Sequence, residues 1–223
     1  MAINSQEIID ELKSVISGRT FDAVLPPLVF VFTNNLFNLN IAAIIALSLA
    51  AILAIRRFIK GENWFYALGG LLGTGLAAGL ALISRTATGY FIPGIITSIL
   101  ILIIALISLI LKKPLAAWAS HLTRGWPLEW FWRDDIKPAY QEVTIFWAVL
   151  FAVRLTVQLI LFRAGDATRL AWANTILGWP VTISVLILSY IYGIWRLKKL
   201  GGPGVDEFRE GKEPPWEGQK KGF

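Results

Sequence analysis

The sequence predicts an all-α, polytopic membrane helix bundle with about six transmembrane helices and additional amphipathic helices at the membrane surface. Three observations lead to this prediction. Hydrophobic residues make up 56% of the 223 residues, and the mean hydropathy is +0.61. Only 16% of the residues are charged, which is too few for the surface of a soluble domain of this size. Ten tryptophans, many of them near the ends of apolar runs, are typical of side chains at the two faces of a bilayer.

Residues 1–19 predict an amphipathic N-terminal helix. Ile8, Leu12 and Val15 recur at helical spacing, with charged residues on the opposite side. The segment does not read as a signal peptide, which would combine a basic start with an apolar centre. We expect this helix to lie on the membrane surface or against the bundle, and the alternative is a docking helix for a partner protein.

Six apolar runs follow and predict one transmembrane domain over residues 20–200. The first opens with Pro26 and Pro27, which are tolerated in a first helical turn. The second starts so close behind it that the two should form a tight hairpin. Several runs fall short of the ~20 residues of a perpendicular span, so four or five spans with one re-entrant segment is the alternative. The six runs are residues 23–39, 41–55, 64–84, 91–111, 143–163 and 174–195.

The distribution of basic residues predicts the orientation of the bundle. With six spans, 17 of the 21 Lys and Arg residues fall on the side that holds both termini and the loops after spans two and four. The opposite side holds only Arg85, Arg163 and Arg169, and Arg154 lies inside the fifth span. Because an excess of Lys and Arg marks the cytoplasmic side, both termini are predicted to be cytoplasmic.

The long connection over residues 112–142 predicts a helix at the membrane interface, broken near Gly125-Trp126-Pro127. One reading is simple anchoring, and the other is recognition of anionic lipid headgroups by Lys112 and Lys113 together with two arginines. Residues 201–223 are polar and rich in Gly and Pro, and they predict a flexible cytoplasmic tail. The candidate interface residues are Trp118, Trp126, Trp130, Trp132, Arg124 and Arg133.

Arg154 is the central candidate for a functional residue. It lies about eleven residues into the fifth span, which corresponds to roughly 16 Å and thus to the membrane midplane. A guanidinium at that depth needs acceptors from the protein. Gln158 lies one helical turn further on, and Asn34 and Asn35 of the first span reach the same depth. No carboxylate lies within a predicted span, so these four residues are either a structural polar clamp or a site for an anionic ligand.

The third span carries four glycines at small-xxx-small spacing, Gly69, Gly73, Gly75 and Gly79. Such a pattern lets a neighbouring helix approach closely. The glycines therefore predict either packing inside the monomer or a homodimer face.

The residue inventory argues against enzymatic chemistry. The chain has no cysteine and a single histidine, His121, which exclude thiolate catalysis and multi-histidine metal sites. P-loop, HExxH and GxSxG motifs do not occur. We therefore predict no catalytic residues, no metal and no cofactor. The expected partners are membrane lipids and either a membrane-protein partner or a second copy of the chain, and no nucleic acid.

Several sequence strings resemble a family of multipass bacterial membrane proteins of unknown function that is best represented in actinobacteria. The resemblance covers roughly residues 18–197, with Pro26 at the family's LP position and Arg154 and Gln158 at its R-x-x-x-Q position. A more distant similarity is to the intracellular septation protein A family, which has no equivalent of Arg154. The strings are FDAVLPPLVFVFTNNLFNL, RRFIKGE, YFIPGI, KKPL and WAVLFAVRLTVQLILF, followed by LGWP.

The resemblance implies a multipass protein of the bacterial inner membrane, linked to envelope synthesis or division. The first hypothesis is a non-enzymatic scaffold or an assembly or maintenance factor of the cell envelope that acts through its cytoplasmic helices. The second is a small transporter, channel or lipid-handling protein with an anionic-ligand site at Arg154. The third is an accessory subunit of a larger membrane complex.

Overall fold

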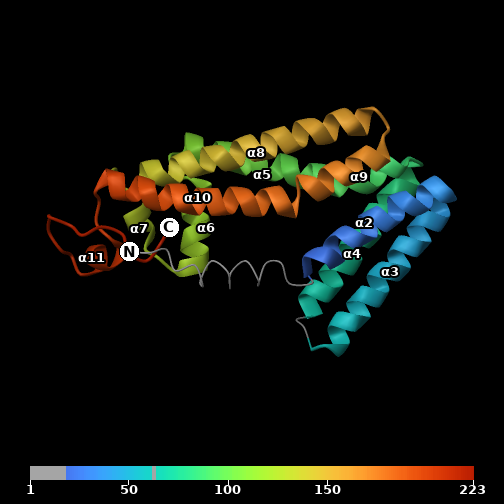
Figure 1. The fold of residues 1–223 in the computed structure, drawn as a ribbon, viewed down its shortest axis with the longest axis horizontal. Helices are drawn as coiled ribbons and strands as arrows, with labels where there is room; N and C mark the ends of the chain where they lie inside the picture. Colours follow the sequence, from blue (N-terminus) through green and yellow to red (C-terminus); the bar gives the residue numbers. More distant parts are fainter. Residues whose placement is uncertain (1–18, 62–63) are drawn as a thin grey trace. The chain divides into compact units, whose positions relative to one another are not determined.

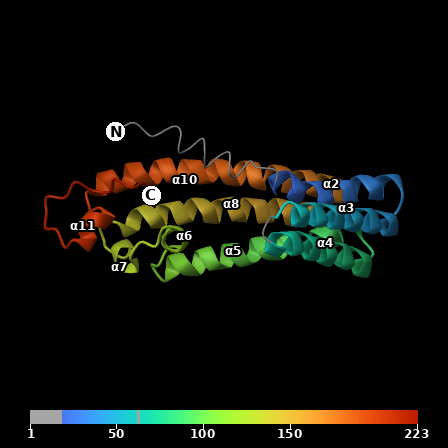
Figure 2. The same ribbon diagram turned by 90° about the horizontal axis from the view of Figure 1, so that it is seen from below.

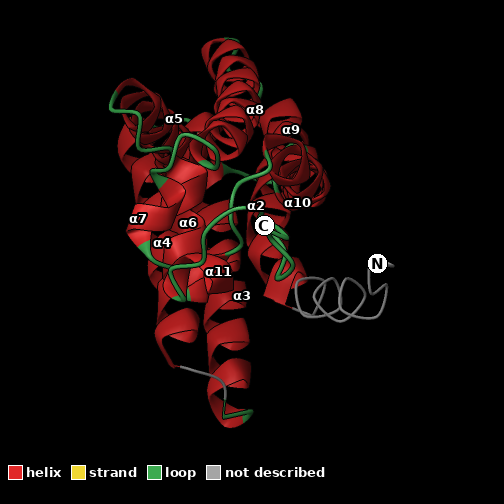
Figure 3. Ribbon diagram, turned by 90° about the vertical axis from the view of Figure 1, so that its left-hand side faces the viewer, coloured by secondary structure: helices red, strands yellow, loops and turns green. Residues whose placement is uncertain are grey.

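A computed structural model describes residues 19–61 and 64–223 of the chain (Figure 1). Every regular element in this part is helical, which confirms the predicted all-α fold (Figure 3). Residues 1–18 of the predicted N-terminal helix lie outside the described residues, and Arg19 begins the first described helix. The elements are α2 (Arg19–Leu36), α3 (Leu39–Ile59), α4 (Trp64–Ser84), the 3-10 helix η1 (Ala87–Phe91), α5 (Ile92–Ile110), α6 (Leu115–Arg124), α7 (Leu128–Phe131), α8 (Lys137–Arg163), α9 (Ala167–Ile176), α10 (Trp179–Leu200) and α11 (Val205–Arg209).

Among the described residues, four helical stretches are long and apolar enough to cross a membrane by length and composition. They are Leu39–Ile59, Ala87–Ile110, Lys137–Arg163 and Ala167–Leu200. Val24–Leu36 and Leu68–Ser84 are shorter apolar helices. These lengths are compatible with a membrane protein, and six remains the predicted number of spans.

The predicted domain over residues 20–200 appears in the structure as parts of two compact units. Among the described residues, unit 1 comprises residues 19–61, 64–96 and 157–179, and unit 2 comprises residues 97–156 and 180–223. Each unit has its own core of buried side chains. Apolar periodicity alone does not reveal such a division, because it does not specify which helices contact one another.

In unit 1, α2 and α3 form the predicted tight hairpin. α2 ends at Leu36 and α3 begins at Leu39. Asn38 is the N-cap of α3, and its side-chain oxygen accepts a hydrogen bond from the Ile41 backbone N–H at 3.0 Å. A capped first turn satisfies a donor that the helix itself leaves unpaired, so the second helix starts directly after the first.

Alanines form the contact between α3 and α4 in unit 1. Ala42, Ala46 and Ala50 recur every four residues on α3 and are buried. Ala78 and Ala81 of α4 are fully buried in the same core. Because these side chains are small, the two helix backbones can approach closely over their length.

The short helix η1 closes unit 1 beside the end of α4. Its Tyr90 ring stacks on Phe30 of α2 with a centroid distance of 4.2 Å. Gly89 lies so close to the end of α4 that an added Cβ would lie 3.0 Å from the Ala81 Cα atom and would collide with the Ser84 hydroxyl. A larger residue at position 89 would therefore push η1 away from α4.

In unit 2, α6 runs across the direction of α8 and α10, and Figure 2 shows α6 nearly end-on while those helices lie lengthwise. α6 ends at Arg124, where Gly125 adopts the left-handed conformation with φ 66°. α7 then starts at Leu128, directly after Pro127. The predicted helix break near residues 125–127 is thus confirmed, with glycine as the stop and proline before the restart.

The segment 201–223, predicted as a flexible tail, packs against the helices of unit 2. Pro203, Gly204 and Val205 are buried, and α11 follows directly. The Phe223 ring stacks on Tyr140 of α8 with a centroid distance of 4.3 Å. The expectation of an unpacked tail is therefore corrected. Its composition is typical of disordered segments, but a few apolar residues fill gaps in an aromatic core, which composition does not show.

Candidate functional site

Arg154 lies in α8, the longest helix of the described chain. Its side chain is half-buried, and its Nε atom is buried without a hydrogen-bond partner among the described residues. A buried guanidinium N–H without an acceptor is costly, because it loses its hydrogen bond to water. The atom is therefore available to an acceptor supplied from outside the described protein atoms.

Gln158 is 1% exposed and binds α9. Its Nε2 atom donates to Asn174 Oδ1 at 2.6 Å, and Asn174 Nδ2 donates in turn to the Leu170 carbonyl at 3.0 Å. The Gln158 Oε1 atom is buried without a partner in the described part of the chain. The start of α5 also lies near, because a Cβ added at Gly94 would lie 3.9 Å from Gln158 Nε2.

Asn35 also binds α9. Its Nδ2 atom donates to Thr168 Oγ1 at 3.0 Å. The neighbouring Asn34 is half-buried on α2. Sequence reasoning had assigned no role to α9, and its Thr168 and Asn174 were missed as partners. One signal was present, because Asp166 followed by an alanine-rich stretch is a helix start, and Asp166 does cap α9 by accepting from the Arg169 N–H at 2.8 Å.

Two of the four predicted cluster residues contact the same helix. The hydrogen bonds of Gln158 and Asn35 connect each of them to α9 within unit 1, and Arg154 belongs to unit 2. A single cluster of Arg154, Gln158, Asn34 and Asn35 stays a prediction.

The four glycines of α4 differ from the expected packing role inside the monomer. A Cβ at Gly69, Gly73 or Gly79 would meet no described atom within 4 Å, and one at Gly75 would lie 3.9 Å from Leu47. The close contact with α3 uses the alanine face of α4 together with Gly75, so the reading of packing inside the monomer is corrected for Gly69, Gly73 and Gly79. The second reading, a face for another copy of the chain, stays a prediction.

Two of the four candidate interface tryptophans are core residues. Trp130 is 0% and Trp126 6% exposed, and their rings pack against each other and against Phe131. Trp118 and Trp132 are more accessible, and their ring centroids lie 5.9 Å apart. The expectation of four interfacial anchors therefore needs correction for Trp126 and Trp130. They are buried because the segment 201–223 and α8 cover them, which the local sequence does not indicate.

The two candidate arginines hold the segment 201–223 in place. Arg124 donates from Nη1 to the Lys221 carbonyl at 3.0 Å and lies over the Trp126 ring at 4.9 Å. Arg133 makes two hydrogen bonds to the Asp135 carboxylate, at 2.9 and 2.7 Å, and lies over the Trp216 ring at 5.2 Å. The hydrogen bonds to Asp135 raise the pKa of Arg133 above its usual value, so it stays charged.

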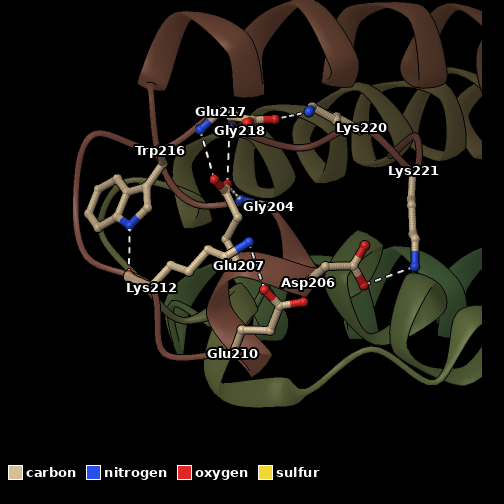
Figure 4. Close-up of polar contacts among 10 residues, drawn as sticks. All are labelled: Gly204, Asp206, Glu207, Glu210, Lys212, Trp216, Glu217, Gly218, Lys220 and Lys221. Atoms are coloured by element: carbon tan, nitrogen blue, oxygen red, sulfur yellow. Dashed lines mark hydrogen bonds and ion pairs between the residues drawn. The ribbon is translucent and has the colours of Figure 1, made fainter.

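Glu207 of α11 organises the backbone of the segment 201–223 (Figure 4). Its carboxylate accepts from the Gly204 N–H at 2.7 Å, the Glu217 N–H at 2.8 Å and the Gly218 N–H at 3.1 Å. An ion pair of 2.8 Å between Lys221 and Asp206 lies beside it. One carboxylate with three backbone donors fixes a loop that has no regular structure of its own.

A charged group that sequence reasoning missed connects α8 and α10. α8 begins at Lys137, before the predicted span start at residue 143, and therefore contains Glu142. The Glu142 carboxylate accepts two hydrogen bonds of 2.8 and 2.9 Å from the Arg196 guanidinium and one of 2.6 Å from the Tyr192 hydroxyl. Such a bidentate contact fixes the register of the two helices.

Unit 2 also contains an apolar groove of about 260 Å³. It is lined by side chains from four helices, including Ile101 of α5, Ala119 of α6, Phe151 of α8 and Val185 of α10. All nine lining residues are hydrocarbon or aromatic except Thr182. The groove therefore offers shape and apolar contact rather than reactive groups.

Comparison with known proteins gives one match. A family described as "Protein of unknown function (DUF3159)" matches residues 17–198. The chain belongs to this family. The DUF3159 match includes Arg154, Gln158 and the groove residues and ends before the segment 201–223. No curated protein and no solved structure matches the chain. The predicted resemblance to a family of unknown function is thus confirmed, whereas the actinobacterial assignment and the similarity to septation protein A stay predictions.

Proposed function

We propose that this DUF3159 protein is a non-enzymatic scaffold or assembly factor of the bacterial inner membrane, with six spans and both termini in the cytoplasm. The observation that carries this proposal is the folded platform at one end of unit 2. We define the platform as residues 115–140 and 197–223. It contains α6, α7, the first turn of α8 and the packed segment 201–223.

The platform combines a rigid interior with binding groups on its surface. Its aromatic core and the Glu207 hydrogen bonds hold its backbone in place. On α6, the Leu122 side chain is 80% exposed and Trp118 is 37% exposed. A preordered surface loses little conformational entropy when a partner binds, and exposed aromatic and aliphatic side chains supply anchor contacts.

The test compares Leu122→Glu with Thr123→Glu, a matched control that adds the same charge at the next exposed position. Each full-length variant replaces the native protein in its host, and envelope integrity and co-purifying proteins are measured. We expect Leu122→Glu to lose a stoichiometric membrane-protein partner and to behave like a deletion, whereas Thr123→Glu behaves like the native protein. Native behaviour of Leu122→Glu in both measurements would contradict the proposal.

A second candidate function is favoured by the unpartnered Nε atom of Arg154. In this function the protein transports or handles an anion, whose oxygen would accept the missing hydrogen bond. Arg154→Lys keeps the charge but loses the planar donor pair, and Arg154→Ala loses both. If Arg154 binds an anion, flux into proteoliposomes should fall from native to lysine to alanine at unchanged stability, with Arg163→Ala, an exposed position on the same helix, as the control. If both Arg154 variants instead lose the same folding stability and their folded fraction keeps the native flux, Arg154 has a structural role.

A further inference from the structure

The apolar groove of unit 2 is lined by residues from the start of α6 and from the middle of α5. Leu115, at the start of α6, lines one end, close to the corner where α5 ends. Ile101 lies nine residues before the last residue of α5, which is roughly 14 Å further along that helix. Half of a hydrocarbon core of about 30 Å is about 15 Å, so this distance along α5 is comparable with the thickness of one leaflet.

The volume of the groove fits part of one acyl chain. One water molecule needs about 10–15 Å³ of such a volume, so 260 Å³ has room for several methylene groups. An empty groove would deprive its lining side chains of contacts on one side, which costs dispersion energy. In a bilayer, acyl chains are the molecules present at sufficient concentration to fill it.

The groove is preformed rather than created by a ligand. Trp147 of α8 lines it and donates its Nε1–H to Ser189 Oγ of α10 at 3.1 Å. The indole N–H thus has its hydrogen-bond partner inside the protein, and the carbon atoms of the Trp147 ring line the groove. The Glu142–Arg196 ion pair joins the same two helices at a second point, which is nearer to the platform. The wall between α8 and α10 therefore keeps its shape without an occupant.

Two exposed lysines lie at the α5–α6 corner shortly before the groove residue Leu115, and Lys113 Nζ lies 5.9 Å from the centroid of the Trp132 ring. Lys112 and Lys113 come directly before α6, and Lys113 is two residues, at most about 7 Å of chain, from Leu115. Their backbone N–H groups bind the Leu109 carbonyl at 3.0 Å and the Ser108 carbonyl at 2.9 Å, which fixes the corner as a helix C-terminal motif. Lys112 has φ 54°, a conformation in which glycine is usual.

The backbone donors at the start of α6 do not compete with the lysines for an anion. The Leu115 N–H donates to Ser108 Oγ at 3.0 Å, and the Ala116 N–H donates to Thr144 Oγ1 at 3.1 Å. Recognition of an anionic group at this corner therefore falls to the two lysine side chains. Clusters of lysine beside a membrane helix attract anionic headgroups.

We propose that the groove binds one anionic phospholipid of the surrounding bilayer. One acyl chain lies between α5, α6, α8 and α10, and the headgroup phosphate contacts Lys112 and Lys113. This site is independent of the scaffold function, because it does not require a protein partner.

The experiment measures lipid retention by native mass spectrometry of the full chain in mild detergent. Phosphatidylglycerol and phosphatidylcholine with identical acyl chains are supplied in equal amounts. We expect the native protein to retain phosphatidylglycerol in preference. Lys112→Gln with Lys113→Gln should lower that preference roughly fivefold per lysine. The matched pair Lys198→Gln and Lys199→Gln removes the same charge from the end of α10 and should leave the preference within about twofold, because these lysines do not adjoin the groove.

A second pair of variants tests the groove itself. Ala119→Phe places a ring in the groove and should reduce retention of both lipids, whereas Ile44→Phe at an exposed position of α3 in unit 1 should not. In addition, lipids with dibrominated acyl chains should quench the tryptophan fluorescence of the native protein more than that of the Trp147→Phe variant, because Trp147 lines the site. Equal retention of the two lipids by the native protein would overturn the proposal. So would equal effects of the two lysine pairs, full retention by Ala119→Phe, or identical quenching with and without Trp147.

Discussion

Replacement of Trp130 with phenylalanine tests whether the segment 201–223 is held against unit 2. Trp130 is completely buried, and its Nε1–H donates to the Pro203 carbonyl at 2.9 Å. Phe131 and Trp126 surround it, with ring centroids 5.0 and 5.5 Å away. Phenylalanine keeps an aromatic ring at this position but removes the hydrogen-bond donor and part of the ring volume.

The expected loss of stability combines two effects. Leaving the buried Pro203 carbonyl without a donor costs about 1–3 kcal/mol. The cavity left by the smaller ring adds about 1 kcal/mol, since truncation of a buried Trp to alanine costs roughly 3–5 kcal/mol. Together these effects lower the free energy of opening of the segment by about 2–4 kcal/mol.

Hydrogen exchange of the backbone amides of residues 201–209 measures this opening directly. If the segment opens and closes faster than exchange occurs, a loss of about 3 kcal/mol accelerates exchange on the order of 100-fold. Trp195→Phe serves as the control, because Trp195 is exposed on α10 of the same unit. Its exchange in residues 201–209 should equal that of the native protein.

Rapid exchange of residues 201–209 in the native protein, at the rate of an unstructured peptide, would refute the packed arrangement. Slow exchange in both the native protein and Trp130→Phe would refute the role of the Trp130–Pro203 contact. An equal acceleration in Trp195→Phe would show that the effect is not specific to the buried indole.

Two further substitutions test the core of unit 1 by SDS titration in mixed micelles. Ala46→Leu inserts a larger side chain into the α3–α4 contact and should lower the free energy of unfolding by about 1–3 kcal/mol, whereas the exposed Ile44→Leu should change it little. A small effect of Ala46→Leu would mean that α3 and α4 do not pack closely. Gln158→Leu leaves the Asn174 side chain without its donor and should cost about 1–3 kcal/mol. Thr156→Val, an exposed change on the same helix, should be close to neutral, and equal costs for both would argue against the contact with α9.

The helical fold could be predicted because its signals are local. Apolar runs and the break at Gly125 and Pro127 each depend on a few neighbouring residues, and both occur as expected. The run predicted over residues 174–195 was displaced, because α10 starts at Trp179 after the separate helix α9. Helix ends are difficult to predict when one apolar stretch continues into the next.

The candidate site was less accessible to sequence reasoning. Arg154 was recognised because a charge within an apolar run is unusual, and it is half-buried in the structure. Its depth did not reveal partners, and Gln158 and Asn35 bind α9 instead. The tryptophans of residues 118–132 were read as interfacial from their abundance, yet Trp130 became a core residue because the segment 201–223 covers it.

The sequence by itself determined that this chain forms apolar helices, approximately where they lie along the chain, and which family it belongs to. Hydrophobicity and capping act over a few residues, so the order of residues along the chain is sufficient for these conclusions. The tertiary structure alone decided that alanines and Gly75 rather than all four glycines join α3 and α4, that Glu142 meets Arg196 and that the segment 201–223 is packed. Each of these features depends on contacts between residues far apart in the chain, and local patterns do not encode which distant side chains meet.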